Sequence, residues 1–160
     1  MANTTFNGPV RSENGFQDIT KTAPTGAVTS TMTLKTYETT ITVANGATTG
    51  KEGSIGIPSN FIPMAVTVVV TSAAGNSVTL NDIGTDADTD GFVDGISPAI
   101  NSVGFKGFFP CNGVLGMSGG ATTAATETAD EVELVVSGDP GADTVIVLKF
   151  FGISSSSDAS

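Results

Sequence analysis

The chain has 160 residues, a formal net charge of −10, only 14% charged residues, one cysteine and no histidine. The six Lys and Arg residues are scattered singly, so the sequence lacks the clustered positive charge that a nucleic-acid backbone requires. Cys111 alone can form neither an internal disulfide nor a thiolate metal cluster, and a chain without histidine has no Ser-His-Asp or Cys-His centre. We therefore expect a protein that is not an enzyme.

The composition favours a single all-β domain. Apolar residues make up 39% of a chain whose length suits one domain, and Thr and Val are frequent while long amphipathic helical patterns are absent. The first residues show no basic segment followed by an apolar run, so we expect no secretory signal. The longest apolar stretches are too short for a membrane helix, so we expect no membrane partner.

Residues 1–26 have no hydrophobic period and are interrupted by glycine and proline, which is typical of an extended arm. A merely disordered tail rarely carries two phenylalanines. We expect the arm to dock either on its own domain or on a neighbouring molecule. Its predicted contact residues are Phe6, Val10, Arg11 and Phe16.

Residues 27–153 are predicted to form the β domain. Alternating patterns over 27–36 and 37–44 indicate strands, and Asn45-Gly46 is a strong turn signal. Residues 54–63, which include two prolines, indicate an edge strand and a turn. Residues 64–81 predict a hairpin with its turn at Gly75-Asn76.

The second half of the domain is predicted to end in two strands joined by a turn at residues 139–141. The last strand, within 143–153, is apolar at nearly every position, so we expect burial by the domain core on one face and by another subunit on the other. Phe105, Phe108 and Phe109 are expected to cap the core or to fill an interface. Residues 154–160 are predicted to be a flexible tail. The whole pattern predicts a β-sandwich or a jelly roll.

The segment 85–95, "TDADTDGFVDG", contains four closely spaced aspartates. It matches the first nine positions of a calcium loop, with Gly91 at the sharp turn, but Ser97 stands where a bidentate Glu is needed. Asp82 could supply the missing carboxylate. The candidate Ca²⁺ ligands are Asp86, Asp88, Asp90 and Asp94.

Two other interpretations of this segment are open. The aspartates can belong to a solvated turn that holds no ion. They can also precede a short helix, since Thr89 or Asp90 could cap it. The apolar residues that follow at helical spacing are Phe92, Ile96, Ile100 and Val103.

Three stretches carry a resemblance: "MANTTFNGPVRSENGF", "SAAGNSVTLNDIGTDADTDGFVDGI" and "FKGFFPCNGVLGM". In them the chain resembles small virion structural proteins of tailed phages of marine bacteria and cyanobacteria, of the capsid decoration (cement) type. The resemblance implies a β-rich protein, frequently a homotrimer, that is made in the host cytoplasm. It implies that the trimer binds the outer capsid surface where major capsid protein subunits meet, and it carries over no catalytic residue or cofactor.

Two alternatives to a decoration protein are also open. One is a virion head or tail fibre domain that binds host surface glycan with calcium. The other is a small calcium-dependent hydrolase that uses carboxylates.

Overall fold

The computed structural model describes residues 17–21, 28–52, 61–115 and 131–156, and of residues 17–21, 28–33 and 154–156 it describes only the backbone. Every regular element in these ranges is a β-strand, which confirms the predicted all-β class. None of these residues belongs to a helix long and apolar enough to cross a membrane. The strands are β1 (Gln17–Lys21), β2 (Val28–Val43), β3 (Thr49–Lys51), β4 (Phe61–Ser72), β5 (Leu80–Thr85), β6 (Gly104–Pro110), β7 (Val132–Val136) and β8 (Thr144–Ser156).

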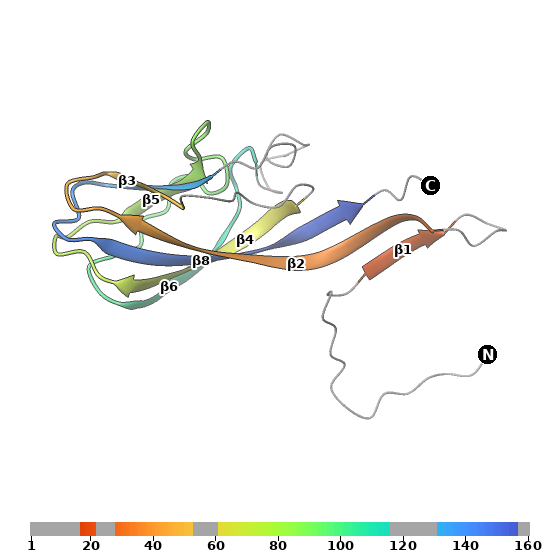
Figure 1. Ribbon diagram of the computed structural model, residues 1–160, viewed down its shortest axis with the longest axis horizontal. Coiled ribbons are helices and arrows are strands. Elements are labelled where there is room, and N and C mark those ends of the chain that lie inside the picture. The colour runs from red at the N-terminus through yellow and green to blue at the C-terminus, as the bar shows by residue number, and fades with distance from the viewer. Residues whose placement is uncertain (1–16, 22–27, 53–60, 116–130, 157–160) are drawn as a thin grey trace, which may run out of the picture.

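The strands form two antiparallel sheets, a larger one in the order β1-β2-β8-β4-β6 and a smaller one in the order β3-β7-β5 (Figure 1). The chain pairs from its ends inward: β2 with β8, β3 with β7, and β4 with β6. β5 meets the segment that follows it through two isolated bridges, Thr79 with Ala99 and Ile83 with Val93. A long hairpin rolled up in this way into two facing sheets is a jelly roll, so the predicted architecture is confirmed.

The core lies between the two sheets. Its side chains come from every second residue of the strands, because successive residues of a strand point to opposite faces. On β8, Ile146, Leu148 and Phe150 are fully buried, and the residues between them point to the opposite face. Phe92, from the segment after β5, packs edge-on against Phe150 with ring centroids 5.5 Å apart. Each such apolar side chain contributes about 1.5–3 kcal/mol to folding, so the core holds the two sheets together.

The larger sheet extends well past the smaller one. β2 has 16 residues and β8 has 13, whereas β3 has 3. Figure 1 shows the far halves of β2 and β8 running on beyond the smaller sheet, with β1 paired along β2. We call this extension, made of β1 with residues 28–36 and 151–156, the ribbon. At about 3.3 Å per residue, its nine β2 residues span roughly 30 Å.

Three loops at the opposite end of the sandwich are joined by hydrogen bonds, and they include the turns predicted at Asn45-Gly46, Gly75-Asn76 and residues 139–141. The carboxylate of Asp139 accepts the backbone N–H of Gly46 at 2.9 Å and that of Gly141 at 2.8 Å. These two donors, with Gly141 the larger cause, lower the pKa of Asp139. The side-chain amide of Asn76 donates to the Asp139 carbonyl at 3.0 Å. The loops therefore close this end of the core as one unit.

The predicted hairpin over residues 64–81 is wrong. β4 belongs to the larger sheet and pairs with β6 and β8, whereas β5 belongs to the smaller sheet and pairs with β7. The turn at Gly75-Asn76 forms, but the backbone N–H of Ala74 binds the Ile100 carbonyl and the N–H of Asn76 binds that of Pro140. These bonds carry the chain across the core from one sheet to the other instead of back along β4.

The outer limits of the domain also differ from the prediction. Gln17–Lys21, assigned to the arm, form the edge strand β1 on the chain's own β2. β8 continues to Ser156, because the ladder with β2 uses backbone groups that serine supplies as well as any residue. The remainder of the arm, 1–16 and 22–26, and the end of the tail, 157–160, lie outside the described residues.

Candidate functional site

The acidic loop after β5 is a tight turn built on its own backbone. The Thr85 N–H donates to the Asp88 carbonyl at 2.8 Å, and the Asp88 N–H returns to the Thr85 carbonyl at 3.2 Å. The Thr85 hydroxyl accepts the same Asp88 N–H at 3.2 Å. Residues 92–99 continue as extended chain bridged to β5, so the helical interpretation of this segment is wrong.

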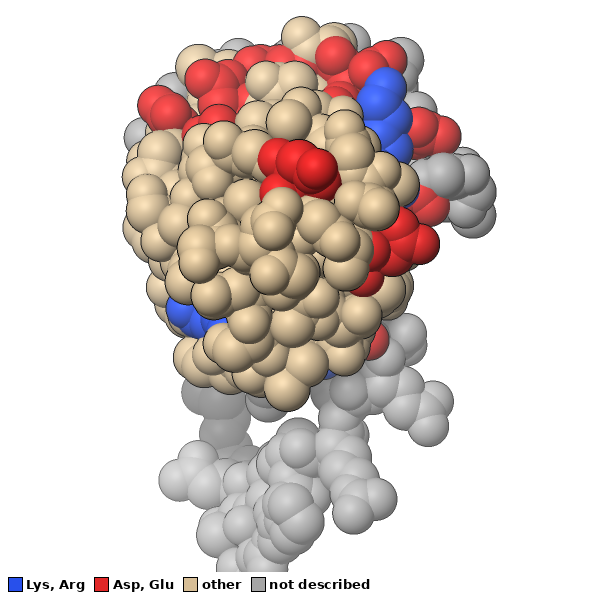
Figure 2. Space-filling model, turned by 90° about the vertical axis from the view of Figure 1, so that its left-hand side faces the viewer, with Lys and Arg blue, Asp and Glu red and all other residues tan. Residues whose placement is uncertain are grey.

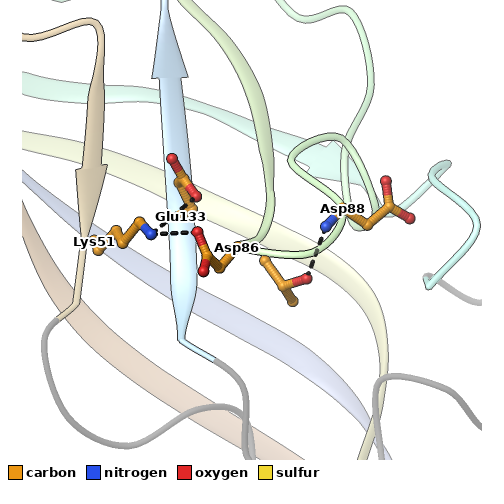
Figure 3. A network of polar contacts seen from close by, with 5 residues as sticks. Lys51, Asp86, Asp88 and Glu133 are labelled. Carbon is orange, nitrogen blue, oxygen red and sulfur yellow. Dashed lines mark hydrogen bonds and ion pairs between the residues drawn. The ribbon is translucent and has the colours of Figure 1, made fainter.

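Lys51 links the acidic loop to the smaller sheet (Figure 3). Its ammonium pairs with the carboxylate of Asp86, just past β5, and lies 3.9 Å from the carboxylate of Glu133 on β7. The hydrogen bond to Asp86 is the main cause that raises the pKa of Lys51. One lysine on β3 thus spans all three strands, and it occupies Asp86, the first of the candidate calcium ligands.

Asp88 and Asp90 form a separate pair. A hydrogen bond between their carboxyl groups is the main cause that raises the pKa of Asp88, followed by partial burial and by the charge of Asp90. In Figure 3 the Asp88 carboxylate points away from the pair of Lys51 and Asp86. The loop therefore divides its carboxylates instead of turning them toward one centre.

Asp94 lies further along the same segment, whereas Asp82 lies on β5, before the loop. The backbone N–H and C=O of Asp94 bind the side-chain amide of Asn112 at 3.0 and 3.1 Å. The carboxylate of Asp82 accepts the Gly95 N–H at 2.9 Å. Among the residues that the structure describes, no three His, Cys, Asp or Glu side chains are grouped to hold a metal ion. Calcium binding by Asp86, Asp88, Asp90 and Asp94 stays a prediction.

The second candidate site is the face of the larger sheet that points away from the core, which we call the outer face. Cross-strand partners form rows on it: Leu34 with Ile153 and Ile62, and Val147 with Val69 and Phe105. Phe108 lies on the same face, with its ring centroid 5.8 Å from that of Phe151. The apolar residues of the outer face are Leu34, Ile62, Val69, Phe105, Phe108, Val145, Val147, Phe151 and Ile153.

A β-bulge sets the two most exposed aromatic residues of this face. Phe105 and Phe108 are three residues apart, so simple alternation would send them to opposite faces. Phe105 pairs with Val69 and Gly107 pairs with Val68, which leaves Lys106 as the extra residue of a bulge. Gly107 has φ 150°, and a Cβ there would lie 2.6 Å from the Phe109 ring. The bulge thus turns both Phe105 and Phe108 outward, 65% and 58% exposed.

The charges of the described residues are divided between the two sides of the sandwich. Glu38 and Lys149 are the charged residues at outward positions of β2 and β8 from Leu34 to Ile153, and their side chains pair at 3.7 Å. The acidic side chains outside β1 and Glu38 belong to the smaller sheet and the loops. In Figure 2, red side chains crowd the upper part of the view, on the side of the smaller sheet, and the lower part is mostly tan. The outer face is close to neutral although the chain carries −10.

Part of these surfaces is predictable from the sequence. Phe105, Phe108 and Phe109 are expected to cap the core or to fill an interface; the structure places Phe105 and Phe108 on the outer face, whereas Phe109 packs on the core. Lys51 and Glu133 were missed, because they lie far apart in sequence and single charges carry no local signal. Phe6, Val10, Arg11 and Phe16 lie outside the described residues. Comparisons with protein-family models, with curated proteins and with solved structures gave no match for the chain.

Proposed function

We propose that the chain is a non-enzymatic virion structural protein, a capsid decoration protein that binds the outer surface of an assembled phage head as a homotrimer. The observation that carries the proposal is the surface of the larger sheet. It combines an exposed apolar face with a ribbon that extends past the core, and both are features of a chain that covers or is covered by other subunits. The resemblance of the sequence to phage virion proteins points to the head as the partner.

The fold agrees with this role without specifying it. Jelly rolls recur in viral capsid proteins and in lectins, and a fold by itself does not fix a function. What a decoration protein needs is a stable core, an extended segment that can dock on a neighbour, and self-association. The jelly roll meets the first need and the ribbon suits the second, since an extended strand adds readily to another sheet.

Head stabilisation would follow from mass action. A protein that binds the assembled shell and not its separate subunits favours the shell, by about 2.7 kcal/mol per site at one hundred times the dissociation constant. Several weak contacts in one oligomer add up, because after the first contact the others form within the same complex.

The test adds the purified protein to undecorated heads and measures co-sedimentation and survival of heat and osmotic shock. We expect co-sedimentation at a fixed ratio to major capsid protein and a higher temperature of head rupture. A variant lacking residues 2–16, which keeps β1, tests the arm, with Phe6, Val10, Arg11 and Phe16 as its predicted contacts. Heads that gain neither bound protein nor resistance would refute the proposal.

The four aspartates of the acidic segment motivate one second candidate, a fibre domain that binds host glycan through calcium. It predicts glycan binding that is lost with EDTA and in Asp88→Ala. Glycan-array binding with that dependence, together with no binding to heads, would favour the fibre domain over the decoration protein.

A further inference from the structure

The outer side of β8 has the composition of a buried surface. On a strand that faces water on one side, apolar and polar residues alternate. β8 instead carries Val145, Val147, Phe151 and Ile153 on its outer side, in addition to the buried residues of its core side. β8 therefore has the pattern of a strand that is covered on both sides, and the outward residues of β2 beside it are polar at positions 36, 38, 40 and 42.

On β2 the apolar side chains lie on the core side within the sandwich and on the outer side within the ribbon. In the sandwich, its apolar residues Ile41 and Val43 point into the core and are fully buried. In the ribbon, where the smaller sheet no longer lies over β2, the apolar side chain that the structure describes on β2 is Leu34, on the outer side beside Ile153 and 54% exposed. Where the core layer ends, the sequence thus moves its apolar residue to the outer face.

The size of the face matches a stable protein interface. Four strands about 4.8 Å apart and about ten residues long cover roughly 600 Å² at 3.3 Å per residue. The apolar side chains occupy the part of this area over β8, β4 and β6, a patch of the few hundred Å² that is often functional. Stable complexes bury about 800 Å² per partner, so the outer face with its surrounding residues reaches that range.

The distribution of charge on the molecule indicates which partner covers the outer face. Two molecules that each carry −10 repel wherever their acidic surfaces approach. The outer face avoids that repulsion, because its only described outward charges from Leu34 to Ile153 on β2 and β8 are Glu38 and Lys149, which cancel. A basic partner would be attracted to the acidic side of the molecule instead. The surface that best complements a neutral apolar face is another neutral apolar face, and each copy of the chain carries one.

We infer that the outer face is where copies of this chain associate with one another, with Phe105 and Phe108 as the main anchors. Aromatic residues are enriched in the buried centres of interfaces, and the bulge at Lys106 and Gly107 brings these two onto one face. The inference rests on the homotrimer of the proposed function and deepens it, because it assigns the surface and the anchor residues through which the copies meet.

The test is the mass of the full-length protein in solution, measured by sedimentation at micromolar concentrations. We expect an oligomer for the wild type, and a larger oligomer fraction at high salt, because salt screens the repulsion between acidic surfaces. The double variant Phe105→Asp with Phe108→Asp should be a monomer, with association weakened by at least about thirtyfold per residue. The milder pair Phe105→Ser with Phe108→Ser should shift the same way.

The matched control is Val114→Asp, since Val114 is 60% exposed but lies after β6, outside the outer face. It should keep the wild-type mass. Circular dichroism checks that all variants keep the β fold. A monomeric wild type, or a double variant that keeps the wild-type mass, overturns the inference. A monomeric protein whose outer face is shielded from solvent only when it is bound to heads would assign the face to the capsid, and this result would also overturn the inference. A monomeric wild type would also remove the homotrimer from the proposed function, whereas binding to heads is measured separately and is decided by its own test.

Discussion

The hydroxyl of Tyr37 offers the sharpest test of how the two sheets are joined. The chain has one tyrosine and no tryptophan, so tyrosinate absorbance reports this group alone. Tyr37 on β2 lies against Phe150, with ring centroids 6.4 Å apart, and its hydroxyl donates to the carboxylate of Glu52 just past β3, at 3.0 and 3.1 Å. Burial first, and then Glu52, raise the pKa of Tyr37 to about 12.

We expect a spectroscopic titration of the folded protein to have its midpoint near pH 12, and that of the protein in denaturant to have it near 10. Glu52→Ala should lower the native midpoint only partly, because burial, the larger cause, remains. Glu52→Gln removes the charge but keeps an acceptor, so its midpoint should fall between those of Glu52→Ala and the wild type. A native midpoint near 10, or one that both variants leave unchanged, would show that the contact between Tyr37 and Glu52 is wrong.

The same group makes stability depend on pH. Between the unfolded pKa near 10 and the folded pKa near 12, the folded chain keeps a proton that the unfolded chain has lost, so stability falls as pH rises. Two pKa units correspond to about 2.7 kcal/mol at most. Because Tyr37 is only partly buried, solvent screening reduces this to roughly 1 kcal/mol. Tyr37→Phe should lack this part of the alkaline loss in urea unfolding, and an identical pH slope in both proteins would refute the reasoning.

Three further predictions concern the core and the acidic loop. Gly84→Ala should cost about 2–3 kcal/mol in urea unfolding, because its Cβ would strike backbone carbonyls of the loop, whereas Gly75→Ala, with its nearest atom at 3.4 Å, should cost much less; equal costs would contradict this packing. Cys111 is fully buried and burial raises its pKa to about 12, so its thiol should react with a disulfide reagent only after unfolding, and prompt native reaction would place it at the surface. Asp88→Asn should raise the free energy of unfolding at neutral pH by less than about 1 kcal/mol, and with it the melting temperature, since the raised pKa of Asp88 beside Asp90 marks a carboxylate that the fold disfavours. The gain in stability should shrink as pH falls through the pKa of Asp88, and a gain that is constant with pH in the presence of EDTA would refute this explanation. Added calcium that raises the melting temperature of the wild type but not of Asp88→Asn would support the calcium prediction.

The sequence predicted the class of fold because class depends on local patterns. Alternation over residues 27–44, the turn at Asn45-Gly46 and the apolar last strand are all local, and each of these elements forms. Strand pairing is not local. A turn such as Gly75-Asn76 has the same sequence signature whether the chain returns along its own strand or crosses to the other sheet, and here the bond from Ala74 to the Ile100 carbonyl is among those that carry it across. That partner could not be read from residues 64–81.

The candidate surfaces were predictable to a smaller extent. The apolar character of β8 indicated that something covers its second face, and the acidic segment was visible as a run of charge. The outward position of Phe108 was not predictable, because a spacing of three residues puts it opposite to Phe105 until the bulge at Lys106 is known. The link from Lys51 to Asp86 and Glu133 was hidden for the same reason, since it depends on the strand order β3-β7-β5.

An exposed apolar face creates a risk of open-ended aggregation, and the edge strand β6 limits it. An unpaired edge can add strands from other chains without end. β6 ends at Pro110, which has no N–H to donate, and its ladder is broken by the bulge at Lys106, whose charge also disfavours strand addition. Contact between copies is thereby directed to the side chains of the outer face and away from this sheet edge. Such contact is finite, because once the faces are covered the assembly presents its acidic sides to its surroundings, and these repel further copies.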